Sequence, residues 1–473
     1  MANISRRHLL RGLGTAGFAA SLGSLSQLSL TPSWAADASG YKAMVCIFLK
    51  GGMDGADTIL PYDQPAYENL KRVRPSLFGA YGSQSSGSSR NRDNLLKLTP
   101  DNDFAGQEFA VPRELSKIRS LFDSGDLAIV GNVGPLIEPT TKTDMINGTA
   151  ILPKRLFSHN DQLSTWMALE PEGAQVGWGG RFMDQVLKAA PHQDPSFSSI
   201  TTWDSDVFLA GQSVSPFRVF PNGTPTPDIY NKPWLIGQTS EDDSARDKLQ
   251  RYLRMNSSTS RNLLEADLLA SRAQAIENSD RFRVAQSQAT ALGTSFADDY
   301  VSTQMRSIAE TIQIRSQLNV SRQMFGVNVY GFDTHNNQAN NIGVLHEILA
   351  TAIASFRDAM IELGEWQNVV VFTASDFGRT LVDNGNGTDH GWGGHHFVAG
   401  GAVRGKQIYG DLPPPEVGAE AYTQTRGRLI PSVSVEQYAA TMGAWFGLSQ
   451  SELYETLPNL RNFNTHDLGF MQG

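Results

Sequence analysis

The sequence has little of several features that would place a protein in a class at once. It contains one cysteine, Cys46, so it cannot form an internal disulfide, and we expect this residue to be a small buried apolar side chain. Charged residues make up 18% of the chain, too few for a coiled coil or a disordered protein. We find no internal repeat. With 473 residues and 40% hydrophobic content, the chain is long enough for a large core.

The N-terminal segment, residues 1–35, lacks the continuous run of about 20 apolar residues that a membrane-spanning helix needs. Instead, Arg6 and Arg7 precede a stretch rich in Gly, Ala and Ser, and Ser33 and Ala35 supply the small side chains of a signal-peptidase site. This order is typical of a twin-arginine export signal. We therefore expect the mature protein to be periplasmic or secreted and to have no membrane span.

Basic residues are scarce in the expected mature chain. Removal of residues 1–35 takes away three arginines and no acidic residue, which leaves 36 basic against 48 acidic side chains. An acidic surface repels partners that carry many phosphates. We therefore expect no nucleic-acid partner and no binding to anionic membranes.

What the sequence does contain is a series of short apolar runs that are rich in β-branched residues and do not alternate with polar ones. Such runs are typical of strands buried on both faces of a parallel sheet. They are Ala43–Leu49, Leu127–Gly134, Phe325–Phe332, Asn368–Ser375 and His395–Gly401. Because helical patterns lie between them, we predict an α/β fold with a mostly parallel central sheet and helices on both faces. We expect one domain, 36–473, with a helical insertion at about 242–318.

Carboxylates and imidazoles recur where these runs end. Asp54 follows the first run, Asp333 and His335 follow the third, Asp376 follows the fourth, and His390 precedes the fifth. Ligands of open parallel sheets bind outside the carboxyl ends of the strands, so we expect these residues to meet at one edge. Asp oxygens and neutral imidazole nitrogens are ligands of Zn²⁺ and Mn²⁺, and a cation would relieve the repulsion between the carboxylates. The sequence therefore predicts a divalent metal site.

Some of these motifs also have a simpler interpretation. A glycine and aspartate cluster such as that around Asp54 is ordinary turn chemistry, and Ser375 or Asp376 could cap a helix. Ser158 opens a helical pattern. It is either the N-cap, with Asp161 as its partner, or a nucleophile activated beside a cation, and the residues leave both possibilities open.

The nine histidines are unevenly spread, and His390, His395 and His396 lie within seven residues. We expect His390 to bind the metal. His395 and His396 begin a strand and point to opposite faces, so at most one of them is expected to contact the substrate or a metal ligand. His159 is likewise a candidate for contact with the substrate or a metal ligand, and Trp392 is a candidate for a wall of the cleft.

Six segments resemble, in order, the family called domain of unknown function 1501 (DUF1501). They are FLKGGMDGADTILP, FSHNDQLSTW, YGFDTHNNQ, FTASDFGRT, GTDHGWGG and GRLIPSVSVEQYAATMGAWFGLS. That family looks like a branch of the alkaline phosphatase superfamily, which includes sulfatases and phosphodiesterases. The resemblance implies a three-layer α/β/α sandwich with a two-metal site at the carboxyl edge of the sheet.

The resemblance also implies roles for individual residues. The metal ligands that it implies are Asp54, Asp333, His335, Asp376 and His390. Ser158 stands at the position of the nucleophile, and Arg379 is a candidate for binding a non-bridging oxygen of the ester. The chain departs from the superfamily in two places, because its Asp/His pair has the spacing D-x-H rather than D-x-x-x-H and because Phe377 replaces an expected histidine.

These features predict an exported metal-dependent hydrolase of phosphate or sulfate esters with a serine nucleophile. The expected cofactor is one or two divalent ions, with zinc first and manganese or calcium as alternatives. The expected partner is an ester substrate, such as an envelope component. Two other functions stay open: a non-catalytic exported binding protein that retains the fold, which Phe377 favours, and a one-metal transferase that acts on envelope polymers.

Overall fold

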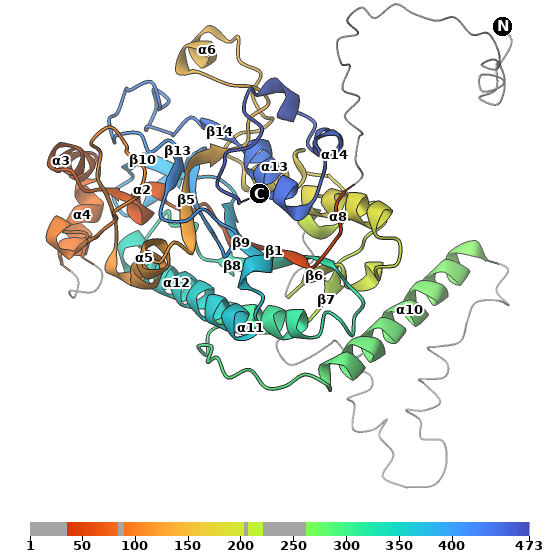
Figure 1. The fold of residues 1–473 in the computed structure, drawn as a ribbon. Coiled ribbons are helices and arrows are strands. Elements are labelled where there is room, and N and C mark those ends of the chain that lie inside the picture. The colour runs from red at the N-terminus through yellow and green to blue at the C-terminus, as the bar shows by residue number, and fades with distance from the viewer. Residues whose placement is uncertain (1–35, 84–88, 203–206, 221–261, 473) are drawn as a thin grey trace, which may run out of the picture. The chain divides into compact units, whose positions relative to one another are not determined.

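The computed structural model describes residues 36–83, 89–202, 207–220 and 262–472 (Figure 1). The expected export signal, 1–35, and the first part of the expected insertion, 242–261, lie outside these residues. The described residues belong to one of the two units into which the chain divides, Ala35–Gly473.

A nine-stranded sheet forms the centre of this unit (Figure 1). Its strand order is β13-β5-β12-β9-β1-β8-β6-β7, and β14 also pairs with β5. The strands are β1 (Lys42–Lys50), β5 (Leu127–Gly134), β6 (Ser199–Thr201), β7 (Phe217–Arg218), β8 (Arg322–Tyr330), β9 (Val369–Ser375), β12 (Gly394–Gly400), β13 (Ile408–Gly410) and β14 (Val433–Ser434). All five strands expected from the apolar runs are present.

One strand of the sheet runs against the others. Strand β1 pairs in parallel with β8 and β9, whereas β12 is antiparallel to both of its neighbours, β5 and β9. The prediction of a parallel strand at His395–Gly401 was therefore wrong in direction. Because β12 is reversed, it begins at the edge where the parallel strands end, and the loop before it reaches the same edge as the loops after β1, β8 and β9.

Helices cover both faces of the sheet (Figure 1). Alternate residues of β1 enter two cores, with Val45 and Ile47 on one face and Met44 and Phe48 on the other. The first core includes residues of α5 (Ser116–Asp123), α11 (Tyr300–Gln313) and α12 (Gln338–Glu362). The second includes residues of α7 (His159–Ala168), α8 (Trp178–Ala189), α13 (Val435–Phe446) and α14 (Gln450–Thr456). The predicted α/β class, with three layers and a mostly parallel sheet, is confirmed.

Smaller elements surround these layers. The helices are α2 (Gly55–Thr58), α3 (Gln64–Val73), α4 (Pro75–Gly82), α6 (Lys142–Asn147) and α10 (Leu263–Gln286). Two small antiparallel sheets contain β2 (Leu60–Pro61), β4 (Phe109–Val111) and β3 (Leu96–Lys97), and β10 (Arg379–Asp383) and β11 (Thr388–His390). The described part of the expected insertion contains α10 and α11. Among the described helices, none is long and apolar enough to cross a membrane.

Candidate metal centre

The loop after β1 passes unusually close to the loops after β8 and β9. Gly51 and Gly52 have φ angles of 115° and 96°. A Cβ atom on Gly51 would lie 2.2 Å from the backbone nitrogen of Asp333, and one on Gly52 would lie 2.6 Å from the ring of Phe377. Glycine is required at both positions because neither the backbone angle nor the space admits a side chain. The two glycines therefore bring three strand-end loops into contact.

Three imidazoles surround the carboxylate of Asp333. The Nε2 atoms of His335, His159 and His390 lie 3.3, 3.5 and 3.7 Å from Asp333 Oδ1. We call these four residues the imidazole cluster. Ligand atoms of His159, Asp333 and His390 all lie within 4.8 Å of one another, and His335 Nε2 is 2.7 Å from His390 Nε2. The loops after β8 and before β12 and the start of α7 thus meet at one point.

Two of these imidazoles are held by an acceptor at the other ring nitrogen. The Nδ1 atom of His159 is 2.7 Å from Asp376 Oδ2. The Nδ1 atom of His390 is 2.7 Å from the carbonyl oxygen of Phe157. Carboxylate and carbonyl oxygens only accept hydrogen bonds, so Nδ1 carries a hydrogen in both rings, and in the neutral form of each ring Nε2 presents a lone pair to the cluster. This is the pattern by which outer hydrogen bonds orient imidazole ligands of metals.

His335 follows the same pattern. Its Nδ1 lies 3.2 Å from Asp389 Oδ1, and Asp389 also forms an ion pair with Arg426. The Nε2 lone pair of His335 therefore faces the Nε2 lone pair of His390. Two lone pairs at this separation repel each other unless a proton or a cation lies between them.

The donor atoms of the cluster fit a divalent cation. The Nε2 atom of His159 is buried and has no hydrogen-bond partner among the described residues, which is costly for a polar atom unless another group satisfies it. Three imidazole nitrogens and one carboxylate oxygen are ligands that zinc takes in four-coordinate sites. A cation would satisfy His159 Nε2 and remove the repulsion between the other two imidazoles.

The protonation states of the cluster also suit a cation. Burial, followed by the charge of Arg379, lowers the pKa of His335, and burial lowers the pKa of His390. Burial alone would raise the pKa of Asp333, but the hydrogen bond and charge of Arg379 bring it below its usual value. The hydrogen bond to its carboxylate partner raises the pKa of His159. Near neutral pH, two neutral imidazoles and an ionised carboxylate are therefore ready to bind metal without releasing protons.

The cluster is open to solvent on one side and closed on the other. The side chain of Asp333 is 47% exposed and that of His335 is 35% exposed. On the closed side, the ring of Phe377 packs against His159 and His390, with centroid distances of 4.8 and 4.5 Å. A bound cation would thus be reachable from solvent on one side, and the ring of Phe377 would close the other side.

Arg379 connects the loops that carry the cluster. Its side chain is buried, and it forms an ion pair with Asp333. Its nitrogens also donate to carbonyl oxygens 2.5 to 3.1 Å away, those of Gly51, Gly52, Phe332 and Thr388. All three nitrogens of the guanidinium therefore have acceptors in this structure. Binding an ester oxygen would require Arg379 to release some of them.

Ser158 lies next to the cluster in sequence and in space. It occupies the N-cap position of α7, but its side chain accepts no backbone N–H. Instead, the hydroxyl donates to Asp161 Oδ2 at 2.9 Å. Phe157, the preceding residue, has a φ of 74° and supplies the carbonyl that holds His390. Ser158 is therefore the N-cap residue with Asp161 as its partner, as one of the two interpretations expects, although its hydroxyl bonds to the carboxylate and not to a backbone N–H.

Asp54 lies in a different environment from the imidazole cluster. Its carboxylate accepts from Arg74 at 2.6 and 2.9 Å, from Gln338 Nε2 at 2.7 Å and from the N–H of Ala56 at 3.2 Å. Asp54 and Arg74 are 1% and 2% exposed. A guanidinium from the chain itself thus neutralises this carboxylate.

A second ion pair extends these contacts. Arg90 pairs with Asp57 at 2.6 Å, and Gln338 Nε2 lies 3.2 Å from the same carboxylate. Gln338 Oε1 accepts from the hydroxyls of Thr334 and Thr388, which belong to the loops that carry the cluster. We call the connected set the buried ion-pair network: Asp54, Asp57, Arg74, Arg90 and Gln338.

The profile of the DUF1501 family, described as proteins of unknown function, matches residues 41–462. The chain belongs to this family. No curated protein sequence matches it. The family membership confirms the resemblance found in the sequence. The description of the family names no activity.

Solved structures similar to this DUF1501 protein have low identity and low TM-scores. One is Ps i-CgsB in complex with k-i-k-neocarrahexaose, with 9% identity and a TM-score of 0.34, covering 90% of this chain and 77% of that chain. Another is the C-terminal periplasmic domain of EcEptC from Escherichia coli in complex with Zn. It has 8% identity and a TM-score of 0.31, and the match covers 77% of this chain and 75% of that chain. A third is alkaline phosphatase from the Antarctic bacterium TAB5. It has 11% identity and a TM-score of 0.29, and the match covers 78% of this chain and 94% of that chain.

The remaining candidate residues of the DUF1501 protein fall into two groups. Asp376 contacts the cluster through His159 and is not itself a member of it. Its carboxylate holds His159 and accepts the N–H of Gly51 at 3.1 Å. No helix follows it, because β9 leads into β10. The other side chains lie away from the cluster. Trp392 is fully buried and donates to the carbonyl of Pro135, His396 is buried against the ring of Trp166, and His395 lines another cavity.

Proposed function

We propose that this DUF1501 protein is an exported metal-dependent hydrolase of phosphate or sulfate esters, with one cation, zinc first, held by the imidazole cluster. The observation that carries the proposal is the buried Nε2 atom of His159, which has no partner among the described residues and lies in reach of Asp333 and His390. The substrate class comes from the sequence resemblance, and an envelope component is the first candidate.

The residues of the chain would divide the reaction between them. A bound divalent cation would polarise the ester and stabilise the charge that develops on its oxygens. Ser158 Oγ would attack the phosphorus or sulfur atom while its proton passes to Asp161. The bond to the leaving oxygen would break, and that oxygen would take up the proton and leave as the alcohol. Water would then release the group from the serine. Arg379 would keep Asp333 in place through their ion pair.

A one-metal transferase is the second candidate, because the observations that support a single cation fit it as well as the hydrolase. The described residues contain one group of at least three metal-ligating side chains, and Arg74 neutralises the carboxylate that the resemblance assigns to another metal. In a transferase, the serine-bound group would pass to a hydroxyl of an envelope polymer instead of to water.

Metal content and ester cleavage test the proposal together. We expect about one zinc per chain after gentle purification and cleavage of p-nitrophenyl phosphate, bis(p-nitrophenyl) phosphate or p-nitrophenyl sulfate. His159→Ala should lose both the metal and the activity. His192→Ala, which removes an exposed histidine of a loop, is the matched control and should keep both. Less than half a metal per chain in the unmodified protein would contradict the proposal and favour a non-catalytic binding protein.

A second variant tests the nucleophile. Ser158→Ala should retain the metal and lose the cleavage of all three esters. Unchanged turnover in this variant would remove the serine from the mechanism. If the metal is present but water-dependent cleavage is absent, release of p-nitrophenol only on addition of a polyol acceptor would identify the transferase.

A further inference from the structure

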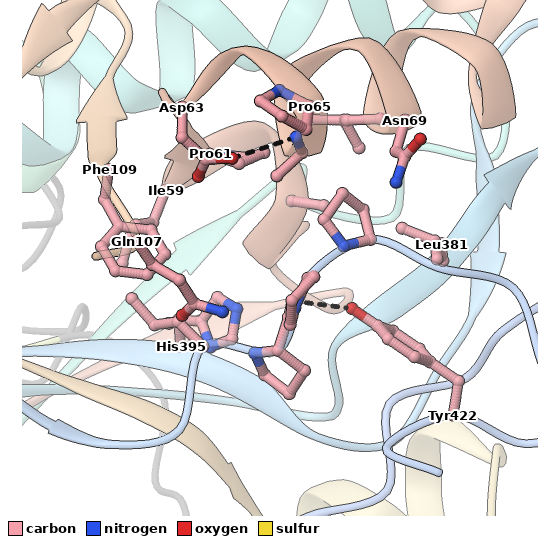
Figure 2. A pocket seen from close by; sticks show the side chains of 17 residues that line it. Ile59, Pro61, Asp63, Pro65, Asn69, Gln107, Phe109, Leu381, His395 and Tyr422 are labelled. Atoms are coloured by element: carbon pink, nitrogen blue, oxygen red, sulfur yellow. Dashed lines mark hydrogen bonds between the residues drawn. The ribbon is translucent and has the colours of Figure 1, made fainter. Parts of the chain in front are cut away.

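A second cavity lies apart from the imidazole cluster (Figure 2). Its volume is about 260 Å³, and its lining comes from α2, α3, β4, the start of β12 and the segment 412–422, with none of the four cluster residues. A buried apolar cavity of about 150 Å³ is large enough to bind benzene. This cavity therefore has room for a small organic molecule.

The walls of the cavity are mostly apolar. Ile59, Phe109 and Leu381 line it, together with the consecutive prolines Pro413–Pro415. Tyr422 also lines it, and its hydroxyl donates to the carbonyl of Pro413 at 3.2 Å, so the polar atom of this side chain already has a partner. A ligand in this cavity would therefore be held mainly by the burial of its own apolar surface.

The charges at the cavity exclude an anionic ligand. Asp63 is the charged side chain of the described lining, which includes no lysine or arginine. One oxygen of Asp63 accepts from the N–H of Ala66 and caps α3. A phosphate or sulfate ester would meet a carboxylate here and no cation. The cavity is therefore not a second copy of the proposed ester site.

One buried side chain presents a hydrogen-bond donor to this apolar space. His395 lines the cavity and is 8% exposed. Its Nδ1 accepts the N–H of Asn132 at 3.0 Å, so the hydrogen of the neutral ring is on Nε2. Burial lowers the pKa of this histidine to about 4, so the ring is neutral. The side-chain amide of Gln107 lies in the same lining (Figure 2) and makes no hydrogen bond to the described residues.

We infer that this cavity binds a small uncharged organic molecule that has an apolar ring or chain and one carbonyl oxygen, which accepts the hydrogen bond of His395 Nε2. The apolar walls account for the ring or chain, and the neutral donor of His395, beside the amide of Gln107, accounts for the carbonyl. The volume accommodates a substituted benzene ring. This binding site does not depend on the proposed hydrolase function.

Three fluorinated probes of similar size test the inference by ¹⁹F NMR titration of the full mature chain. They are 4-fluoroacetophenone, which has the carbonyl, 4-fluoroethylbenzene, which lacks it, and 4-fluorobenzoate, which is an anion. We expect the ketone to bind about fivefold more tightly than the hydrocarbon, as one neutral hydrogen bond allows. The benzoate should bind most weakly. Equal binding of all three probes would overturn the inferred preference for an uncharged carbonyl compound. No binding of the ketone up to its solubility limit would overturn the site itself and leave a cavity that holds water only.

Two further measurements locate the probe. Ala66→Leu adds a larger side chain to the lining and should weaken ketone binding at least about tenfold, whereas Ala270→Leu, at an exposed position of α10, should leave it unchanged. With ¹⁵N-labelled histidine and no substitution, the ketone should shift the His395 signal and leave that of His396, which packs on the opposite face, in place. A ketone that binds Ala66→Leu as tightly as the unmodified protein, or that moves both signals equally, would contradict the site.

Discussion

The imidazole cluster and the buried ion-pair network lie next to each other and both contain aspartates from strand-end loops, yet these carboxylates are satisfied in opposite ways. In the buried network, the carboxylate of Asp54 receives two hydrogen bonds from Arg74 and one from Gln338. In the cluster, Asp333 meets three imidazoles, and a nitrogen of His159 has no partner among the described residues. The two regions differ in the source of the positive charge that balances the carboxylate. In the buried network the chain supplies it with an arginine, and in the cluster the chain supplies only part of it.

This comparison separates structural from functional use of charged residues. Where a guanidinium from the chain saturates a buried carboxylate, removing either partner leaves an uncompensated charge in the core. Where a ligand must supply the charge, the ligand-free side chains stay half exposed and their loss costs little folding free energy. Stability and metal affinity should therefore respond to substitutions in different regions.

The largest expected effect is on stability in the buried network. Arg74→Ala should lower the free energy of unfolding by about 3–5 kcal/mol, because it leaves the carboxylate of Asp54 buried without its partner. Arg72→Ala, two residues earlier on the exposed side of α3, should change it by less than about 0.5 kcal/mol. Urea denaturation of the two variants measures the difference. A loss below 1 kcal/mol in Arg74→Ala would mean that Asp54 does not depend on this pair.

The next effect concerns the cluster and depends on metal. Zinc at 100 times its dissociation constant should stabilise the folded protein by about 2.7 kcal/mol, because it binds the folded state and not the unfolded one. Thermal melts at increasing zinc concentration should show this for the unmodified protein and for His192→Ala. In His390→Ala the shift should disappear. An equal shift in all three proteins would place the zinc somewhere else.

A smaller effect concerns pH and a histidine beside the buried network. His346 is fully buried against the hydroxyl of Thr58, and burial lowers its pKa to about 3. Between pH 6.5 and pH 5 the unfolded chain therefore takes up a proton that the folded chain does not, which lowers the free energy of unfolding by up to about 2 kcal/mol as pH falls. In His346→Leu, urea denaturation at the two pH values should show a difference smaller by this amount. An unchanged pH dependence would mean that His346 is protonated in the folded protein.

Apolar patterning was sufficient to predict most of the fold. The five runs became the central strands because a parallel sheet buries both faces of each strand, which is what an unalternating run encodes. The reversal of β12 had no such signal, since composition and period are the same for either strand direction. The expectation that His390 joins the residues that follow β8 and β9 is met only because β12 is reversed, since the loop before a parallel strand would lie at the opposite edge.

The site was predicted in part, for a related reason. Asp333, His335 and His390 follow or precede strands and do meet in the structure. The position of Asp54 beside Arg74 could not be predicted, because a partner twenty residues away, between α3 and α4, leaves no local motif. His159 was predicted to contact the substrate or a metal ligand and not to bind the metal itself, because the catalytic role was assigned to its neighbour, Ser158.

The smallest expected effect tests whether the two regions are coupled at all. Gln338 donates to Asp54 and accepts from Thr334 and Thr388, whose loops carry the metal-ligand candidates Asp333 and His390. Gln338→Leu should weaken zinc binding by less than about tenfold. Asp376→Asn, which alters a direct partner of a ligand, should weaken it by about 10- to 100-fold. Competition titration with a zinc chelator measures both. If zinc affinity in Gln338→Leu equals that of the unmodified protein while stability falls, the network serves only the fold. A measurable loss would mean that the buried ion pairs also hold the loops on which the metal depends.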